Sequence, residues 1–528
     1  MEPAGVAGRA AQAVSEYGWR AGGRWVAPAV SVAALVVYVA TLAPGLTTAH
    51  AGVDGGDLVT AAQTLGVPHP TGYPTYTLLA RLATHLPLGT PAYRANLLSA
   101  VCTALAAGLV CATAGHLLDG TTRAHLIAAA AGLSLAFASL PWSQAVIAEV
   151  YALLLLCAAL LVWLVVRWRQ DKGRSHRHRL LWTAALVLGL GLGNHLTLLF
   201  LVPGLLVLLW PERSSWGRPR VLLPAAGLFL AGLAVYTYLP LAAAGQPPVA
   251  WGDPRTWDRF LWVVTGQPYR PYVLALPLAA VPGRLGAWAG LLGDQLGWWG
   301  LGLAAIGAWA CWQPARRPLA LAALVWVLPA AMYAFFYATD DAYVLLLPLM
   351  VPMALAWAVG VGTLERWNVG TFKRWLVIAV ALVLPVLSLA MHWSAADLSR
   401  NREAEAYVGQ ALGGAAPGAL IMTQGDRATF WLWHGLYAEE RRPDVAVVNA
   451  PLLAYDWYRE QVRRLSPDLV VPEPENPDAP LDDLVRELMG QALDQRPVYA
   501  ADPPAAWGEW FRLEEDEGGT GLMVVQAR

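Results

Sequence analysis

Lysine, cysteine and charge are all scarce in this sequence. Only 14% of its 528 residues are charged and the formal net charge is −1, which excludes a globally basic nucleic-acid-binding protein. Lysine occurs only twice. The few cysteines all fall within apolar runs, where they behave as small hydrophobic side chains and form neither a disulfide framework nor a metal-ligand spacing: Cys102, Cys111, Cys157 and Cys311. We therefore expect no cysteine chemistry.

Long apolar runs dominate what is present. Hydrophobic residues make up 57% of the chain and the mean hydropathy is +0.45, which is typical of a mainly α, polytopic membrane protein. A membrane-spanning helix needs about 20 apolar residues. By this measure we expect about eleven spans, near 26–43, 95–116, 124–141, 145–166, 180–194, 196–210, 221–240, 287–311, 318–337, 343–364 and 374–393.

Two of these boundaries rest on more than hydropathy. The stretch 180–210 could be one tilted helix, but we divide it because Gly191-Leu-Gly-Asn-His195 interrupts it and both of its flanks are basic. Loops rich in Lys and Arg stay cytoplasmic, so two basic flanks require an even number of crossings. The N-terminus lacks a short apolar region with a small-residue cleavage site, so we expect the first span to be retained.

Charge asymmetry then orients the whole chain. With the N-terminus inside, the inner segments hold 18 Lys/Arg against 6 Asp/Glu, and both lysines, Lys172 and Lys373, are among them. The first outer loop (44–94) and everything after the eleventh span then face outward. We expect a membrane domain over 1–393 in the cell (inner) membrane, and an extracytoplasmic domain over 394–528.

The tail has the composition of a small soluble α/β unit. Its pattern predicts a βαβ arrangement with strands at 419–423 and 444–449 around a helix at 428–440. A further helix (455–465), a Pro/Glu-rich loop (471–480) and late strands at 497–500 and 522–526 complete the expected fold.

The first outer loop carries the strongest candidates for chemistry. Asp54 lies in a Val-Asp-Gly-Gly turn at the expected membrane surface, where a carboxylate suits a general base for an acceptor hydroxyl. Asp57 is a second catalytic candidate, although it could equally cap a helix that begins at Leu58. The glycines between them would let a substrate approach the backbone. His69 and Tyr73 lie in the Pro-rich turn that follows, where substrate contact and a structural role are both open.

Other polar residues gather at the same predicted face. Glu149 and Tyr151 lie near the outer end of the fourth span, where an ionisable residue is a functional candidate unless an arginine pairs with it. Asn194 and His195 occupy an outward turn and could equally be hydrogen-bonded turn residues. Asp340 and Asp341 form an outward acidic pair that suits a metal, a sugar or solvent. No cluster has a metal-ligand spacing, so no cofactor is assigned and a divalent cation stays open.

A lipid phosphate would need outward-facing cations. Trp251 and Asp253 open a loop rich in aromatic residues and arginine, and a Trp/Tyr belt at the membrane interface is the alternative interpretation. The outward arginines that could meet a phosphate are Arg81, Arg94, Arg255, Arg259 and Arg270.

These motifs together resemble the protein O-mannosyltransferase-like membrane proteins, a family that includes an animal transmembrane O-mannosyltransferase. The first-loop stretch from Asp54 to Tyr76 is similar to that family's Asp-Ser-Gly-Glu loop and its His-Pro-Pro-Gly-Tyr-Pro-Leu turn. Further segments follow in the family's order: Phe137–Trp142, Ala148–Tyr151, Gly193–His195, Tyr238–Pro240, Trp251–Pro254, Gly425-Asp426 and Arg442–Val445. The chain departs from the pattern at Gly55, Asp57, Thr71 and Thr75, where the family has Ser, Glu, Pro and Leu.

The resemblance implies a GT-C type fold and a donor sugar on a polyprenyl or dolichyl phosphate. We therefore expect an inverting membrane glycosyltransferase that moves a sugar, such as mannose, to an acceptor hydroxyl on a protein, lipid or glycan, with Asp54 as the general base. A transporter or flippase for polyprenyl lipid or sugar is the alternative, but it should show inverted repeats and midplane polar residues. Here the polar residues cluster at one face.

Overall fold

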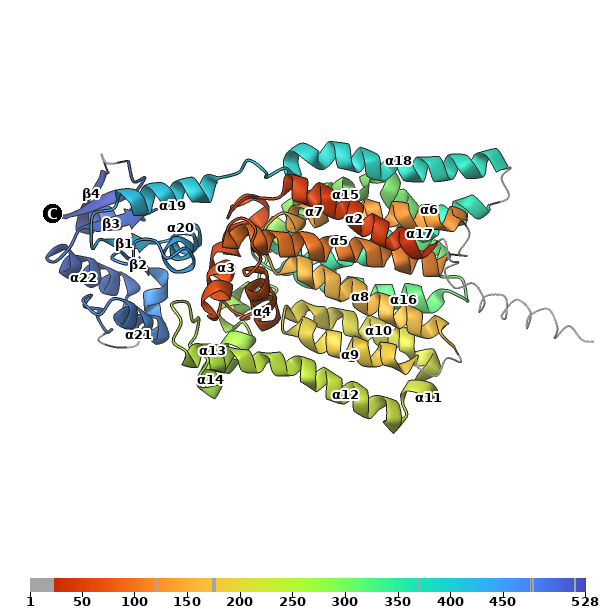
Figure 1. Cartoon of the computed structure of the whole chain (residues 1–528), viewed down its shortest axis with the longest axis horizontal. Helices are drawn as coiled ribbons and strands as arrows, with labels where there is room; N and C mark the ends of the chain where they lie inside the picture. Colours follow the sequence, from red (N-terminus) through yellow and green to blue (C-terminus); the bar gives the residue numbers. More distant parts are fainter. Residues whose placement is uncertain are drawn as a thin grey trace, which may run out of the picture.

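The computed structural model describes residues 23–118, 122–172, 177–367, 371–474, 476, 479–516 and 519–528. A long helical body carries a small α/β region at one end, and the first loop lies between the two (Figure 1). Most of the expected cytoplasmic N-terminus, parts of the expected inner loops at 119–123, 167–179 and 365–374, and part of the Pro/Glu-rich loop lie outside the described residues.

The helical body is that of an integral multi-pass membrane protein. Among the described residues, seven helical segments are long and apolar enough to cross a membrane. Three of them are single helices: α5 (Pro91–Leu117), α8 (Tyr151–Gln170) and α16 (Arg317–Phe336). Leu196–Trp216 contains α10 (Leu201–Leu209), Pro219–Ala244 contains α12 (Pro219–Leu233), and Ala342–Arg366 contains α17 (Met350–Arg366). The last segment, Phe372–Ala396, is nearly all of α18 (Thr371–Ala396).

The remaining apolar helices are bent, short or broken. The pair α6 (Thr122–Ala136) and α7 (Ser139–Ala145) passes the span test only together and is bent by 64°. Two apolar helices are short, α2 (Val26–Thr41) and α9 (His178–Leu192). The long α15 (Val281–Ala310) breaks at Gly297, where φ is +66°. The stretch 180–210 does form two helices, α9 and α10, so dividing it is confirmed; the count of eleven stays a prediction.

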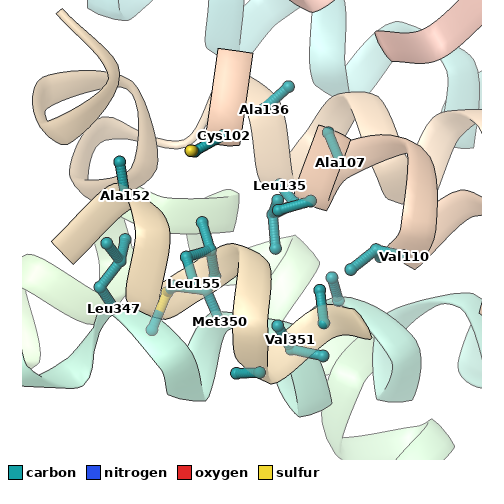
Figure 2. Packing of buried hydrophobic residues seen from close by; sticks show 14 of the residues in the cluster. Cys102, Ala107, Val110, Leu135, Ala136, Ala152, Leu155, Leu347, Met350 and Val351 are labelled. Atoms are coloured by element: carbon teal, nitrogen blue, oxygen red, sulfur yellow. The ribbon is translucent and has the colours of Figure 1, made fainter. Parts of the chain in front are cut away.

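Small residues set the packing of the body. A Cβ on Gly307 of α15 would collide with the carbonyl of Ala356 on α17, and a Cβ on Gly360 would collide with the carbonyl of Leu303. Helices in a membrane associate through such close backbone contacts, because lipid supplies no hydrophobic drive between them. The main core is built from α5, α6, α8 and α17, and Cys102 lies within it as one more small apolar side chain (Figure 2). All four cysteines are buried and unpaired.

The first loop is itself folded. It contains the short helix η2 (Ala49–Asp54), α3 (Gly55–Thr64) and α4 (Pro74–Ala83). Pro74 begins α4, as expected of proline in a first helical turn. Val67 exchanges backbone hydrogen bonds with Val249 and Trp251, so the first loop and a later loop at 238–272 form one layer. That later loop contains α13 (Tyr238–Ala244), α14 (Trp257–Val264) and η6 (Gln267–Tyr272).

The tail forms a five-stranded sheet in the order β2-β1-β3-β5-β4. Strand β1 (Leu420–Thr423) is parallel to β2 (Ala446–Asn449) and β3 (Val498–Ala501), while β5 (Met523–Ala527) runs antiparallel to β3 and to β4 (Phe511–Glu515). Helix α20 (Asp426–Trp433) continues as the π-helix η9 (His434–Ala438) and connects β1 to β2, which confirms the expected βαβ unit. The other helices are α19 (Glu403–Gly414), α21 (Asp456–Leu465), α22 (Leu481–Leu493) and α23 (Trp507–Trp510).

The core of this C-terminal region does not stop at residue 394. Side chains from the first loop, including Leu46, Val59 and Ala61, belong to the same buried cluster as β1, β2 and α20. A Cβ on Gly56 would lie 2.6 Å from the carbonyl oxygen of Phe430, so α20 rests directly on the backbone of α3. We expected Gly56 to let a substrate approach the backbone, but the residue that approaches it is Phe430 of α20.

Candidate active site

Asp54 sits where η2 turns into α3. His50 and Ala51, just before it, have φ values of +61° and +64°, a conformation that non-glycine residues adopt only when the surroundings hold them there. Asp54 occupies the N-cap position of α3, yet its carboxylate makes no capping hydrogen bond. The side chain is 39% exposed. The backbone therefore fixes the position of Asp54, and its carboxylate remains accessible to a substrate.

Asp57 is fully buried and its two oxygens are both occupied. The backbone N–H of His69 donates to Asp57 Oδ2 at 2.8 Å, and His69 Nδ1 lies at the same distance from that oxygen. The indole N–H of Trp251 donates to Asp57 Oδ1 at 2.9 Å. Because α3 begins at Gly55, Asp57 lies in its first turn and does not cap a helix at Leu58. That interpretation was wrong, and Asp57 instead orients His69.

His69 joins the two carboxylates. Its Nδ1 faces Asp57, and its Nε2 lies 3.6 Å from Asp54 Oδ2. Burial by itself would lower the pKa of His69, but the charge of Asp54 together with the hydrogen bond and charge of Asp57 outweigh it and raise the pKa to about 9. The imidazole is therefore protonated at neutral pH and places a positive charge beside Asp54.

The pKa of Asp54 is raised to about 6. The largest cause is partial loss of solvent around the carboxylate, whose side chain is 39% exposed. The charge of His69 opposes this rise, and the charges of Asp426, Asp57 and Asp341 add to it. A base with a pKa just below neutral is ionised at pH 7 and still accepts a proton effectively.

Glu149 is a buried acid close to the same centre. Its side chain belongs to a residue only 2% exposed, and its Oε1 has no hydrogen-bond partner among the described residues. Burial, and then the charge of Asp54, raise its pKa well above the usual value. No described arginine or lysine forms an ion pair with it, so the structural alternative that we considered for Glu149 lacks its partner.

An aromatic wall connects the next candidates. The ring of Tyr73 lies 5.1 Å from that of His69 and stacks on His195 at 6.2 Å, and Tyr151 lies 5.5 Å from His195. His195 Nδ1 accepts the backbone N–H of Thr197. Burial, with the charge of His69, lowers the pKa of His195 to about 4, so this histidine is neutral.

Asn194 has a supporting position in the same wall. Its amide donates to the carbonyl of Val150 at 3.0 Å, which ties the turn between α9 and α10 to the start of α8. The side-chain oxygen has no partner within the described part of the chain. Tyr73, Tyr151, Asn194 and His195 are therefore brought to the Asp54 centre, as their shared predicted face indicates.

The predicted arginines each have partners close by in the chain. Arg94 donates to backbone carbonyls of Thr84, Leu88 and Gly89, so it holds the first loop together. Arg255 is paired with Asp253 at 2.6 Å. Arg270 donates to Thr265 Oγ1 at 3.3 Å. Trp251 of the later loop joins the Asp54 centre through its hydrogen bond to Asp57.

Three further residues lie near the centre: Asp341, for which the sequence left several roles open, and Asp426 and Tyr269, which were not site candidates. The negative charges of Asp341 and Asp426 help to raise the pKa of Asp54. The charges of Asp54 and Asp426 likewise help to raise the pKa of Tyr269. A Gly-Asp step at a strand end and an acidic pair at a span mouth were visible in the sequence. The sequence did not show that these residues lie close together, because their proximity depends on how the tail and α16–α17 pack.

An apolar cavity of about 550 Å³ lies inside the helical body. Its wall includes Trp288 and Leu292 of α15 and Leu346 and Leu349 from the segment after Asp341. Arg284, one turn before Trp288, donates to the carbonyl of Thr339 at 3.0 Å. The segment 339–349 thus links this arginine, the carboxylate of Asp341 and the cavity wall. Among the residues described, no three His, Cys, Asp or Glu side chains group as a metal site.

Two family models match the chain. The N-terminal domain of protein O-mannosyl-transferase TMEM260 matches residues 54–216, and TMEM260-associated domain 2 matches residues 404–468. The mouse (Mus musculus) protein O-mannosyl-transferase TMEM260 is 28% identical over 483 residues, which cover 86% of this chain and 66% of the mouse protein. The chain therefore spans about two thirds of that relative's length. These matches confirm the resemblance to the O-mannosyltransferase-like family.

The fold has solved counterparts. Crystal structures of ArnT from Cupriavidus metallidurans in the apo state and bound to undecaprenyl phosphate superpose with TM-scores of 0.61 and 0.60 at 12% identity. They cover 94% and 96% of this chain and 96% and 98% of the ArnT chains. The expected GT-C type fold is confirmed.

Proposed function

We propose that this chain, whose family resemblance is to protein O-mannosyltransferase-like proteins, is a membrane glycosyltransferase. It would move a sugar from a polyprenyl-phosphate donor to an acceptor hydroxyl on the extracytoplasmic side of the cell membrane. The observation that carries this proposal is the Asp54–His69–Asp57 arrangement, in which a partly exposed carboxylate is held 3.6 Å from an imidazole that is fixed by a buried carboxylate.

In the reaction, Asp54 acts as the general base. The acceptor oxygen attacks the anomeric carbon while the bond from that carbon to the phosphate oxygen breaks, and the acceptor proton passes to Asp54. The lipid phosphate leaves with the bonding electron pair, so attack from the opposite face inverts the anomeric centre. The charge on His69 keeps Asp54 ionised beforehand and offsets the negative charge of the phosphate.

The lipid part of the donor suits the apolar cavity. A polyprenyl chain is a flexible hydrocarbon, and the walls of the cavity are formed by apolar side chains of several spans. Arg284, one turn before the cavity-lining Trp288, would bind the phosphate, since guanidinium groups pair with phosphate oxygens in a bidentate manner. The undecaprenyl phosphate in one ArnT structure supports a donor of this class.

The two titrating groups predict a bell-shaped pH dependence. Below pH 6 Asp54 is protonated and cannot accept the acceptor proton, and above pH 9 His69 loses its charge. Replacing His69 with Gln removes the positive charge that lowers the pKa of Asp54. We expect the acidic limb of kcat/KM to move above pH 6 and the basic limb near pH 9 to disappear. His85→Gln, on the exposed end of the same loop, is the control, and unchanged limbs in His69→Gln would contradict this assignment.

Glu149 is proposed to act as a neutral acid. With its pKa raised well above the usual value, it can donate a hydrogen bond to the sugar or phosphate, as a protonated carboxyl does in an apolar site. Glu149→Gln keeps a neutral hydrogen-bond donor, so kcat/KM should fall by less than about 10-fold, whereas Glu149→Ala should lower it by about 100-fold. A loss in Glu149→Gln as large as that of Glu149→Ala would show that ionised Glu149 is required.

The proposed function is tested with purified protein in liposomes and a labelled polyprenyl-phosphate mannose. Release of the lipid phosphate together with labelled acceptor supports the transferase. Appearance of intact donor in the opposite leaflet without release of lipid phosphate would replace it with the flippase alternative. Serine- and threonine-containing peptides, glycolipids and glycans, offered separately, distinguish the acceptor classes.

A further inference from the structure

Trp251 connects the centre of the proposed site to the C-terminal region. Its indole N–H donates to Asp57 Oδ1 at 2.9 Å, and its ring lies 6.3 Å from that of His69 in an edge-on arrangement. On its other side, the same ring packs against Phe430 at 6.2 Å and Trp457 at 5.7 Å. One side chain therefore contacts both the pair that orients Asp54 and two helices of the tail.

The tail is fixed against the membrane body at this point. Phe430 belongs to α20, whose backbone meets Gly56 of α3. Trp457 belongs to α21, where Gln461 donates to the carbonyl of Pro248 at 2.8 Å and Arg464 donates to the carbonyl of Gln246 at 2.6 Å. The loop that carries Trp251 is thus held on both sides by the tail.

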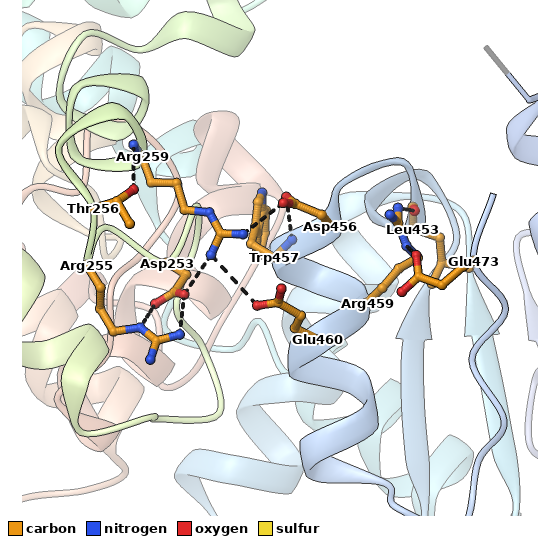
Figure 3. Close-up of polar contacts among 10 residues, drawn as sticks. All are labelled: Asp253, Arg255, Thr256, Arg259, Leu453, Asp456, Trp457, Arg459, Glu460 and Glu473. Carbon is orange, nitrogen blue, oxygen red and sulfur yellow. Dashed lines mark hydrogen bonds and ion pairs between the residues drawn. The ribbon is translucent and has the colours of Figure 1, made fainter. Parts of the chain in front are cut away.

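Ion pairs of one arginine also join the two sides of this contact. Arg259 of α14 lies 2.8 Å from Asp253 on its own loop and 2.8 Å from Asp456 on α21, with Glu460 at 3.8 Å (Figure 3). Asp253 follows Trp251 by two residues and also binds Arg255. A bridged set of charges of this kind fixes geometry more than an isolated surface pair does.

We infer that Trp251 is a positioning residue through which the docked C-terminal region sets the geometry of the Asp57–His69 pair. This inference rests on the proposed transferase function and deepens it. Asp57 needs a fixed orientation to present Oδ2 to His69, and Trp251 holds the opposite oxygen. The ring of Trp251 has its own orientation fixed by Phe430 and Trp457. The tail then acts on the catalytic centre through these contacts.

The indole N–H also tunes the charge of the pair. By donating to Asp57 it stabilises that carboxylate and weakens its pull on the His69 proton. Without this donor, Asp57 becomes a stronger acceptor for His69 Nδ1–H. His69 should then keep its proton to a higher pH. This effect distinguishes a positioning role from simple support of the fold, which would lower activity without moving the titration.

Trp251→Phe is the direct test, because it keeps an aromatic ring and removes the N–H. In the full-length protein with labelled polyprenyl-phosphate mannose, we expect kcat to fall by about 10- to 100-fold with a smaller change in KM. The basic limb of kcat/KM should move upward by about one pH unit. The matched control is Trp262→Phe: Trp262 packs on Tyr455 and Trp457 in the same contact and has no bond to Asp57, so its limbs should stay in place.

A double-mutant cycle tests whether docking acts through Trp251. Trp457→Leu loosens the ring from the tail side and should lower kcat by itself. If Trp251 carries the effect, Trp457→Leu should add little in the Trp251→Phe background. Effects that multiply, or a Trp251→Phe protein with normal kcat and unmoved limbs, overturn the inference. Absence of sugar transfer in the wild-type protein would instead reject the proposed function.

Discussion

Replacing Asp54 with Asn is expected to lower kcat/KM for sugar transfer by about 10²- to 10⁴-fold, the range over which general bases contribute. The amide has nearly the same shape as the carboxylate but cannot take the acceptor proton. Asp54 makes no capping hydrogen bond to α3, so the variant should fold and insert normally. The measurement is the rate of labelled sugar transfer, alongside the thermal unfolding temperature in detergent.

The control for this variant is Asp258→Asn. Asp258 is an exposed carboxylate in the first turn of α14, on the same end of the molecule. It should retain wild-type activity, which separates a base from the general loss of one negative charge near the site. Turnover by Asp54→Asn within a few fold of the wild type would remove Asp54 from its proposed role.

Asp57→Asn should be nearly as damaging, for a different reason. Asp57 is fully buried and accepts from both His69 and Trp251. An amide in its place keeps one acceptor, so either Trp251 or His69 meets an N–H group instead of an oxygen. His69 also loses the negative charge that raises its pKa, so its protonated fraction at pH 7 falls.

We expect kcat/KM of Asp57→Asn to fall by about 10²-fold or more, with a loss of stability of about 1–3 kcal/mol from the mispaired buried groups. The stability loss should distinguish it from Asp54→Asn, which leaves buried hydrogen bonds intact. The two measurements are the transfer rate and the midpoint of thermal unfolding. An Asp57→Asn protein with a native midpoint and native rate would show that the His69 contact is dispensable.

The parts of this site that could be predicted from sequence are those encoded locally. Apolar runs predicted the helices, and the βαβ pattern predicted β1, α20 and β2. The dense polar loop after the first span pointed to Asp54 and His69. The expectation that Asp57 caps a helix failed because helix onset at Gly55 depends on close packing with α20, which propensity at Asp57 and Leu58 does not report.

Contacts between distant segments account for the rest. The arginines were chosen as phosphate ligands from their predicted side of the membrane, yet Arg94 is occupied by carbonyls of its own loop and Arg255 by Asp253. Arg284 was not a candidate because its interest depends on two features of the tertiary structure: its bond to Thr339 and its place one turn before the cavity-lining Trp288. Helices α19 and α22 and strand β4 were missed because their short patterns resemble exposed loops until the sheet orders them.

The contact between Gly56 and Phe430 also bears on how the protein is made. Residues separated by more than 370 positions must come into contact before the core around the first loop is complete. A ribosome-bound chain that ends within the spans therefore contains Asp54 and His69 but lacks the packing of α20 on α3. Formation of long-range contacts of this kind is late and slow compared with local helix formation. We therefore expect a nascent or truncated chain to show no sugar transfer until α20 has packed on α3.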